Sequence, residues 1–261
     1  MSFGIPLFFA ALTKKGKRVA RVRPAVGCVA IFCVLSACAV PIPPAGINDP
    51  DEAKNREIHA FNVALDKSLV RPISQGYGKI PVPVQRGVSN FSGNLDLPGE
   101  VVNHVLQGRP GPALQNTLRF AVNTVVGIGG LFDPATAIGI PEEETDFGET
   151  LHVWGAGEGA YVVLPVLGAS TERDAVGTIV DIVMNPVSRL VPSPESYIGT
   201  AAKVGSKLGD RGRFAATIDS ILYGSADGYA QMRLLYLEKR RYELGQTGGV
   251  SDDNFEDPYA E

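Results

Sequence analysis

Residues 146–165 read DFGETLHVWGAGEGAYVVLP, a stretch in which glycines alternate with short apolar pieces. The Gly155–Gly159 segment has the composition of a phosphate-binding loop, yet it precedes an apolar piece, whereas a dinucleotide loop follows a strand and opens a helix. Glu158 would also repel phosphate. We therefore expect a tight turn or close packing at these glycines, and then a short strand or a buried extended segment over residues 161–167.

Helical patterns lie on both sides of this stretch. Apolar residues recur at helical spacing from Ile58 to Leu69 and predict a helix that ends near Val70. Its start is predicted at Asn48-Asp49-Pro50, with a capping Asp and a Pro in the first turn. Further helices are expected over about residues 84–95, 99–106, 112–126, 171–183, 195–208 and 212–243, with Gly224 and Gly228 as candidate breaks in the last.

The fold class that these patterns predict is mostly α. We find no internal repeat, and residues 127–169 form a glycine-rich, less regular middle. Residues 246–261 are acidic with little to bury, so we expect a disordered tail. No stretch after residue 37 is apolar enough to cross a membrane by itself, which needs about 20 apolar residues.

The N-terminus predicts a bacterial lipoprotein signal over residues 1–37. A basic stretch from Lys14 to Arg23 holds no acid, and the apolar run 25–35 that follows has the length of a secretory signal. The run ends in LSAC, in which small residues precede Cys38. We expect cleavage before Cys38 and a covalent diacylglyceryl and N-acyl lipid on it, with no other cofactor. Residues 38–47 are proline-rich and predict an extended tether, and Ala39 favours the outer membrane.

Charge and cysteine content exclude several classes of function. Loss of the signal would remove six basic residues and leave 18 Lys and Arg against 28 Asp and Glu, a net charge near −10. Nucleic acid is thereby disfavoured as a partner, because phosphate backbones are bound through Lys and Arg. Cys28 and Cys33 would leave with the signal, so no thiol would remain for a disulfide, a metal site or a nucleophile.

Few residues indicate catalysis, and we expect no enzyme. His59, His104 and His152 lie in separate segments, and no serine stands in a Gly-x-Ser-x-Gly elbow. We expect the acidic run 142–146, which precedes a helix, to be solvated or favoured by the helix dipole and not to form a metal site, which needs oxygens converging from fixed positions. Trp154 suits either a membrane interface or the core.

The stretch 146–165 resembles the signature D-F-G-x-T-L-x-x-[WY]-G-x-G-x-G-x-Y-x-x-L-P of the MlaA/VacJ family of outer-membrane lipoproteins. The resemblance extends in consistent order over about residues 48–243, including Asn55-Arg56, Phe61-Asn62 and Gly87 to Leu95, and implies a helical domain over residues 48–245. One departure is Ala160, where Pro is common in the family. The signature positions are Asp146, Phe147, Gly148, Thr150, Leu151, Trp154, Pro165, Arg173 and Asp174.

The resemblance implies a ring-like assembly of amphipathic helices that lies in the membrane interface and encloses an amphipathic channel. It implies removal of mislocalised phospholipids from the outer leaflet of the outer membrane and transfer to an MlaC-like periplasmic carrier, which maintains lipid asymmetry. A trimeric porin is the expected β-barrel partner, and the protein would sit in the periplasmic leaflet on its lipid anchor.

Glycine-rich backbone is tolerated at membrane depth where protein or a water-filled cavity satisfies it. We therefore consider two interpretations of the glycine-rich segments, pore-lining backbone and plain turns. The candidate lipid-path residues are Gly127, Gly129, Gly130, Gly155, Gly157, Gly159 and Tyr161. Two other functions compete with lipid transport: a phospholipase, against which the missing nucleophile motif speaks, and a lipoprotein that only scaffolds partners.

Overall fold

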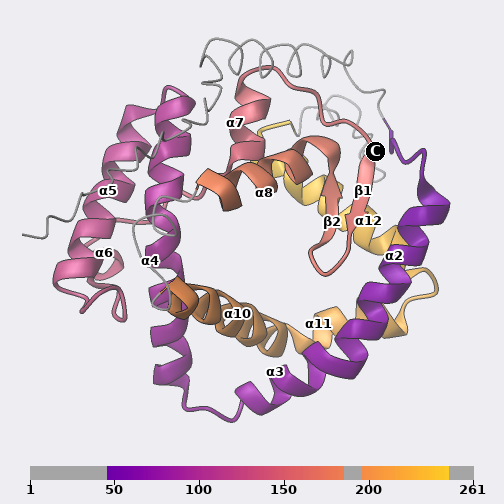
Figure 1. Ribbon diagram of the computed structural model, residues 1–261, viewed down its shortest axis with the longest axis horizontal. Helices are drawn as coiled ribbons and strands as arrows, with labels where there is room; N and C mark the ends of the chain where they lie inside the picture. Colours follow the sequence, from indigo (N-terminus) through magenta and orange to yellow (C-terminus); the bar gives the residue numbers. More distant parts are fainter. Residues whose placement is uncertain (1–45, 185–195, 247–261) are drawn as a thin grey trace, which may run out of the picture. The chain divides into compact units, whose positions relative to one another are not determined.

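The computed structural model describes residues 46–184 and 196–246 (Figure 1). The predicted signal, Cys38, most of the tether, the prolines 186, 192 and 194 and most of the acidic tail therefore lie outside the described residues. The described helices are α2 (Glu52–Leu65), α3 (Arg71–Tyr77), α4 (Val82–Leu106), α5 (Pro110–Val125), α6 (Pro134–Ala137), α7 (Phe147–Val153), α8 (Glu172–Met184), α10 (Ser196–Arg213), α11 (Ala215–Asp219) and α12 (Gly228–Glu243).

The described helices and strands contact one another in an order that closes on itself. From α4 this order runs through α10 and α3 to α2, then across the hairpin of β1 (Tyr161–Leu164) and β2 (Gly168–Thr171) to α8, α7 and back to α4. Figure 1 shows these elements following one another around a ring, with α5 packed against α4. The ring-like, mostly α architecture that the resemblance implies is confirmed.

Two segments are more continuous than the sequence predicted. The first helix does not end near Val70, because a π-helical turn, η1 (Asp66–Val70), leads directly into α3. Pro72 is the second residue of α3, directly after this π-helical turn. Residues 84–95 and 99–106 are not two helices but one, α4, which accommodates Pro98 in its interior.

The start of α2 differs from the predicted cap. The helix begins at Glu52 after Asp51, and Asp51 makes no side-chain cap hydrogen bond. Asp49 instead accepts hydrogen bonds from Tyr229 and Arg233 of α12. This contact joins the beginning of the described chain to its last helix, and Asp49 also accepts from the Asn55 side chain of α2 at 2.9 Å.

The antiparallel hairpin pairs Tyr161 with Thr171 and Leu164 with Gly168, which decides for a strand over residues 161–164. Two asparagines of α2 satisfy the free edge of β1. Asn55 donates to the Tyr161 carbonyl at 3.0 Å and accepts from the Val163 N–H at 2.9 Å. Asn62 does the same for Leu164 and Val166. These side chains replace a third strand, because an edge of unpaired backbone groups would otherwise be left.

The second half of the chain follows the predicted pattern more closely. Thr171 accepts from the Asp174 N–H at 3.3 Å and opens α8, as expected of a cap. The long C-terminal helical segment breaks near Gly224 and Gly228, between a π-helical turn, η2 (Ser220–Gly224), and α12.

Candidate functional site: a polar hollow in a ring with an apolar exterior

The polar face of α5 is buried and its apolar face is exposed. Asn116, Arg119 and Asn123, which are at most 6% exposed, recur at helical spacing along the buried face. The exposed fractions of Leu114, Leu118 and Val125 are 61%, 48% and 80%. This is the reverse of the usual pattern in a protein surrounded by water, whose helices turn an apolar stripe inward.

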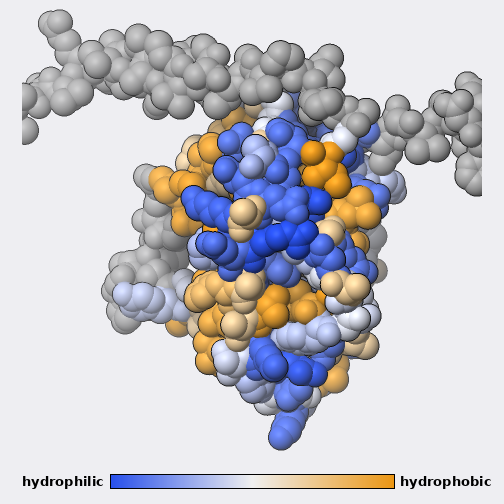
Figure 2. All heavy atoms as spheres, turned by 90° about the vertical axis from the view of Figure 1, so that its right-hand side faces the viewer, coloured by the Kyte–Doolittle hydropathy of each residue, from blue (hydrophilic) through white to orange (hydrophobic). Residues whose placement is uncertain are grey.

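Other helices show the same reversal. On α8, Arg173 and Asp174 are buried, whereas Ile179 and Ile182 are more than 60% exposed. Figure 2 shows apolar side chains gathered into patches beside hydrophilic ones on the side of the molecule that carries α2. An exposed apolar surface of this extent marks contact with a membrane or a partner.

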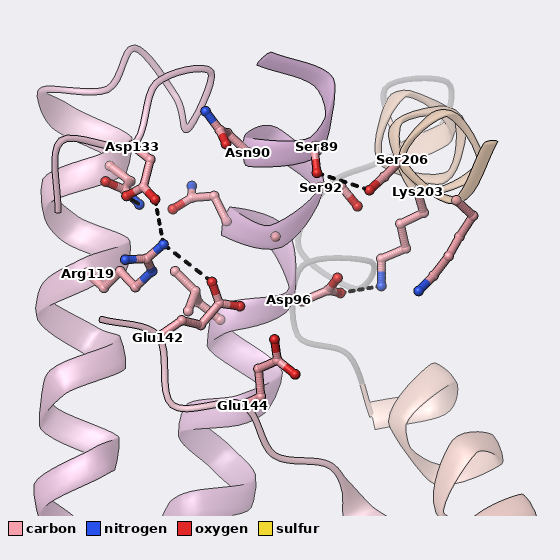
Figure 3. Close-up of a pocket in the computed structure, with 15 residues that line it drawn as sticks. Ser89, Asn90, Ser92, Asp96, Arg119, Asp133, Glu142, Glu144, Lys203 and Ser206 are labelled. Carbon is pink, nitrogen blue, oxygen red and sulfur yellow. Dashed lines mark hydrogen bonds and ion pairs between the residues drawn. The ribbon is translucent and has the colours of Figure 1, made fainter. Parts of the chain in front are cut away.

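A polar hollow of about 460 Å³ lies among α4, α5, α10 and the loop before α7 (Figure 3). Its volume is within the range of small-molecule sites. The side chains that line it come mostly from polar positions of α4 and α10, together with charged groups of α5 and the loop. They include Ser89, Asn90, Ser92, Asn94, Asp96, Arg119, Asn123, Asp133, Glu142, Glu144, Lys203, Ser206 and Lys207.

Arg119 organises one wall of this hollow. It donates to Asp133 at 2.7 Å and to the hydroxyl of Thr136 at 2.8 Å, and its guanidinium lies 3.4 Å from the Glu142 carboxylate. Burial alone would raise the pKa of Asp133, but hydrogen bonds from Thr136, Asn123 and Arg119 keep that pKa below its usual value. Asp133 is therefore a fixed anion that orients Arg119.

Two glutamates near Arg119 have pKa values that are raised and not lowered. Burial, together with the negative charges of Glu142, Asp96 and Glu144, raises the pKa of Glu100 to about 9. Burial also raises the pKa of Glu142, although Arg119 opposes the shift. Glu100 is thus protonated at neutral pH, where Asn116 donates to it at 2.9 Å. Protonation of Glu100 lowers the electrostatic repulsion among these carboxylates.

A second hollow, of about 750 Å³, shares Ser89 and Asn90 with the first. Arginines dominate its charged lining: Arg71, Arg86, Arg211 and Arg213 stand against Asp219. Arg211 donates to Asp66 at 2.9 and 2.8 Å and to Asp219 at 2.6 Å, so it joins α10 to the π-helical turn η1. Because the two hollows share Ser89 and Asn90, they adjoin each other at α4.

Most of the signature residues join elements of the ring and do not line the hollows. Asp146 accepts from the Glu149 N–H at 2.8 Å, which caps α7, and from Arg240 of α12 at 2.7 Å. Gly148 lies against Gly177 so closely that a Cβ on Gly177 would come within 2.4 Å of its nitrogen. A Cβ on Gly148 would in turn come within 2.5 Å of the Asp174 carboxylate and 2.8 Å of the Arg240 guanidinium, so neither position has room for a side chain.

The remaining signature residues surround this joint. Thr150 is fully buried and bonds to Asn103 and Gln107 of the α4 end, and Leu151 is buried beside it. Arg173 and Asp174 form an ion pair at 3.1 Å. Trp154, which is 50% exposed, packs edge-to-face on Phe147 and donates to the Leu106 carbonyl. It therefore does not fill the core, while Pro165 lies in the exposed hairpin turn.

The candidate lipid-path glycines lie outside the lining of both hollows. Gly129, Gly130, Gly155 and Gly159 have positive φ angles, which indicates turns. Gly130 lies against Asn94 and thus behind the wall of the first hollow, and Gly127 lies against the Asn123 carbonyl. Gly157 is half-buried in irregular backbone. Tyr161 belongs to the apolar core with Val163, Tyr229 and Leu237. A direct contact of these residues with lipid stays a prediction.

No residue that lines the hollow was predicted from the sequence to lie on a lipid path, although Glu142 and Glu144 were noted as part of the acidic run 142–146. That run is not simply a solvated loop, because Glu142 is half-buried beside Arg119 and Asp146 is an N-cap. The available signal was the polar spacing Asn116, Arg119 and Asn123 on α5. Within residues 46–184 and 196–246, no group of His, Cys, Asp and Glu side chains is arranged to hold a metal ion.

The three histidines stay apart. His104 is buried and bonds to the Glu143 carbonyl at 2.9 Å. Burial lowers the pKa values of His59 on α2 and His152 on α7. The part of the chain that the structure describes contains no helix both long and apolar enough to cross a membrane.

A helical ring with an apolar exterior and a polar hollow defines the class, and comparison with known proteins supplies the family. The family model of the MlaA lipoprotein matches residues 47–243, and the chain belongs to this family. The chain is 35% identical over 209 residues to the "Intermembrane phospholipid transport system lipoprotein MlaA" of Escherichia coli, which covers 78% of this chain and 80% of that one.

Two further proteins are similar to this chain in sequence or in structure. An uncharacterized protein of Rickettsia bellii is 35% identical over 189 residues, which is 72% of this chain and 73% of the relative. A solved chain from work on the "structural basis for maintenance of bacterial outer membrane lipid asymmetry" superposes with a TM-score of 0.65 at 32% identity. It covers 75% of this chain and 98% of the solved one.

Proposed function

We propose that this chain is a lipoprotein of intermembrane phospholipid transport that removes mislocalised phospholipids from the outer leaflet of the outer membrane and so maintains lipid asymmetry. The reversed packing carries the proposal. Apolar side chains such as Leu114, Leu118 and Val125 face outward, and charged ones such as Arg119 face inward. A protein built this way is suited to lie among acyl chains without a spanning helix.

The hollow supplies the second requirement of lipid transport. A phospholipid headgroup loses its hydration when it leaves the membrane surface, and charged groups are costly to bury unless they are paired. The two adjoining hollows offer Arg, Lys, Asp and Glu side chains to such a headgroup. The acyl chains would remain in contact with the apolar exterior or with lipid.

The names of the relatives support this function. The protein of Escherichia coli is named for intermembrane phospholipid transport, and the solved chain comes from work on outer-membrane lipid asymmetry. The ring and its signature joint are the parts that this chain shares in sequence order with the family. The proposal requires no bond to be made or broken, so it assigns no catalytic residue, no cofactor and no metal.

The anchor and the partners are parts of the same proposal. A lipid on Cys38 followed by a tether over residues 38–47 would hold the ring in the periplasmic leaflet of the outer membrane. Each buried CH₂ contributes about 0.8 kcal/mol, so two or three acyl chains give nearly irreversible attachment. We propose an MlaC-like periplasmic carrier as the acceptor of the lipid and a trimeric porin as the β-barrel partner, with no nucleic-acid partner.

Deletion of the gene tests the proposed function. Phospholipid in the outer leaflet is labelled on intact cells with an amine-reactive reagent that does not cross the membrane. We expect more label in the deletion strain than in the parent, and a return to the parental level when the gene is restored. An unchanged level of surface phospholipid would contradict the proposal, and fatty acid released by the pure protein would point to a phospholipase.

A further inference from the structure

The hollow among α4, α5 and α10 is lined by charges of both signs. Asp96, Glu142 and Glu144 point toward the same space in Figure 3, and Lys203 reaches toward them from α10. Lys203 forms an ion pair with Asp96. Among residues 46–184 and 196–246, Glu144 and Lys207 make no hydrogen bond and no ion pair, although both line the hollow. One anion and one cation are therefore available to a ligand.

A further unsatisfied group lies in the same wall. Asn94 is only 4% exposed and lines the hollow, and its amide nitrogen donates to Thr124 at 3.1 Å. Its amide oxygen has no hydrogen-bond partner in the described part of the chain. Buried polar atoms of this kind are normally satisfied, so an unsatisfied acceptor indicates a missing donor.

The electrostatics of the acidic wall favour a cationic group. Glu142, Asp96 and Glu144 are all close enough to Glu100 to raise its pKa, in addition to the effect of burial. A positive group near these carboxylates would lower their mutual repulsion. A primary ammonium is the best match, because it adds N–H donors for the carboxylates.

We propose that this hollow is a headgroup subsite for phospholipids that carry a primary ammonium beside the phosphate, such as phosphatidylethanolamine. The ammonium would face Glu144 and Glu142, and the phosphate would face Lys207. This assignment rests on the proposed function and adds a preference to it. An anionic headgroup without an amine would bring no positive charge to these carboxylates. A quaternary ammonium would bring the charge but would lack the N–H donors.

Lipid exchange on the purified full-length lipoprotein tests the preference. The protein in detergent is equilibrated with equal amounts of phosphatidylethanolamine and phosphatidylglycerol of different acyl mass, and the lipid retained after gel filtration is measured by mass spectrometry. We expect about fivefold enrichment of phosphatidylethanolamine, as for one net favourable ion pair. Retention of the two lipids in the ratio of the mixture would overturn the proposal.

Single substitutions locate the preference within the hollow. Glu144→Gln and Lys207→Gln should each bring the ratio of retained lipids close to that of the mixture. Glu57→Gln and Lys54→Gln change the same charges on α2, outside both hollows, where neither side chain forms an ion pair within the described residues. These two control variants should retain the enrichment. An enrichment that survives both substitutions in the hollow would overturn the assignment.

Two further outcomes separate the possible failures. A protein that retains both lipids equally, in a strain whose surface phospholipid depends on the gene, leaves the proposed function standing and overturns only the headgroup preference. The same exchange with soluble glycerophosphoethanolamine separates the two sources of this headgroup. We expect the soluble compound to be lost during gel filtration while lipid stays bound. A protein that retained the soluble compound and no lipid would overturn the lipid assignment.

Discussion

The guanidinium of Arg240 on α12 lies 3.1 Å from the Asp174 carboxylate at the start of α8. The same nitrogen of Arg240 donates to Asp146 at 2.7 Å, and Tyr236 donates to Asp174 at 2.8 Å. Both members of the pair are largely buried. The last helix of the described chain is thus joined to α7 and α8 by charges that few other groups could replace.

Substitution of Arg240 by Leu should lower the free energy of unfolding by about 3 kcal/mol, because it leaves Asp174 buried beside fewer positive groups. Chemical unfolding of the protein in detergent, followed by far-UV circular dichroism, measures the change. Lys239→Leu is the matched control, since Lys239 is 76% exposed and its pair with Glu243 is a surface contact. Equal stability of the two variants would show that this joint contributes little.

The approach of α7 to α8 gives a second prediction. A Cβ on Gly177 would lie 2.4 Å from the nitrogen of Gly148, so Gly177→Ala must push the helices apart. We expect a loss of about 2 kcal/mol in the free energy of unfolding, as for an overpacked interior.

Gly76→Ala is its control, because a Cβ there meets no atom within 4 Å and the residue is an exposed position of α3. This substitution should be neutral or stabilise by about 0.5 kcal/mol. If Gly177→Ala melted at the same temperature as Gly76→Ala, the close approach would be unimportant for stability.

How far the fold could be predicted is clearest on α5. Apolar spacing predicted the helix, yet the polar set Asn116, Arg119 and Asn123 has helical spacing too. Periodicity defines two faces but not which of them meets the interior, because that depends on the surrounding solvent. The resemblance to the family supplied the ring, whereas the hollow depends on α4, α5 and α10 coming together from distant parts of the chain.

Boundaries failed where a local signal competed with packing. Pro98 lacks an N–H and disfavours a helix interior, which led to two helices in place of α4. The helices α5 and α10 pack along α4, and the stabilisation from this packing exceeds the loss of one backbone hydrogen bond at Pro98. Asp66 begins a π-helical turn, and its carboxylate accepts hydrogen bonds from Arg211 and Tyr223. No sequence pattern in this segment predicted such a turn.

The raised pKa of Glu100 makes stability depend on pH. Burial and the carboxylates of Glu142, Asp96 and Glu144 raise this pKa from 4.5 to about 9, against the opposite effect of Arg119. The folded state therefore binds a proton that the unfolded state releases above pH 4.5. The contribution of Glu100 to the free energy of unfolding therefore falls as pH rises from about 4.5 to about 9.

Glu100→Gln should remove that part of the pH dependence. We expect the variant to exceed the parent by about 2 kcal/mol at pH 8.5 and to match it near pH 4.5, because Gln still accepts the bond from Asn116. Unfolding curves across this range provide the measurement. Glu57→Gln, an exposed change on α2, should follow the parent at every pH. Parallel curves for the parent and Glu100→Gln would mean that Glu100 ionises normally.

Cys38→Ser should abolish function through mislocalisation, because no acyl chain could then be attached to the thiol. Cys38 precedes the described residues, which begin at Gly46, and we expect the circular dichroism of the variant to remain that of the parent. Membrane fractionation and outer-leaflet labelling on intact cells would measure location and function together. Cys28→Ser is the control, since this cysteine would leave with the signal and the variant should behave as the parent. A Cys38→Ser protein that is released from the membrane yet keeps surface phospholipid at the parental level would show that the anchor is dispensable.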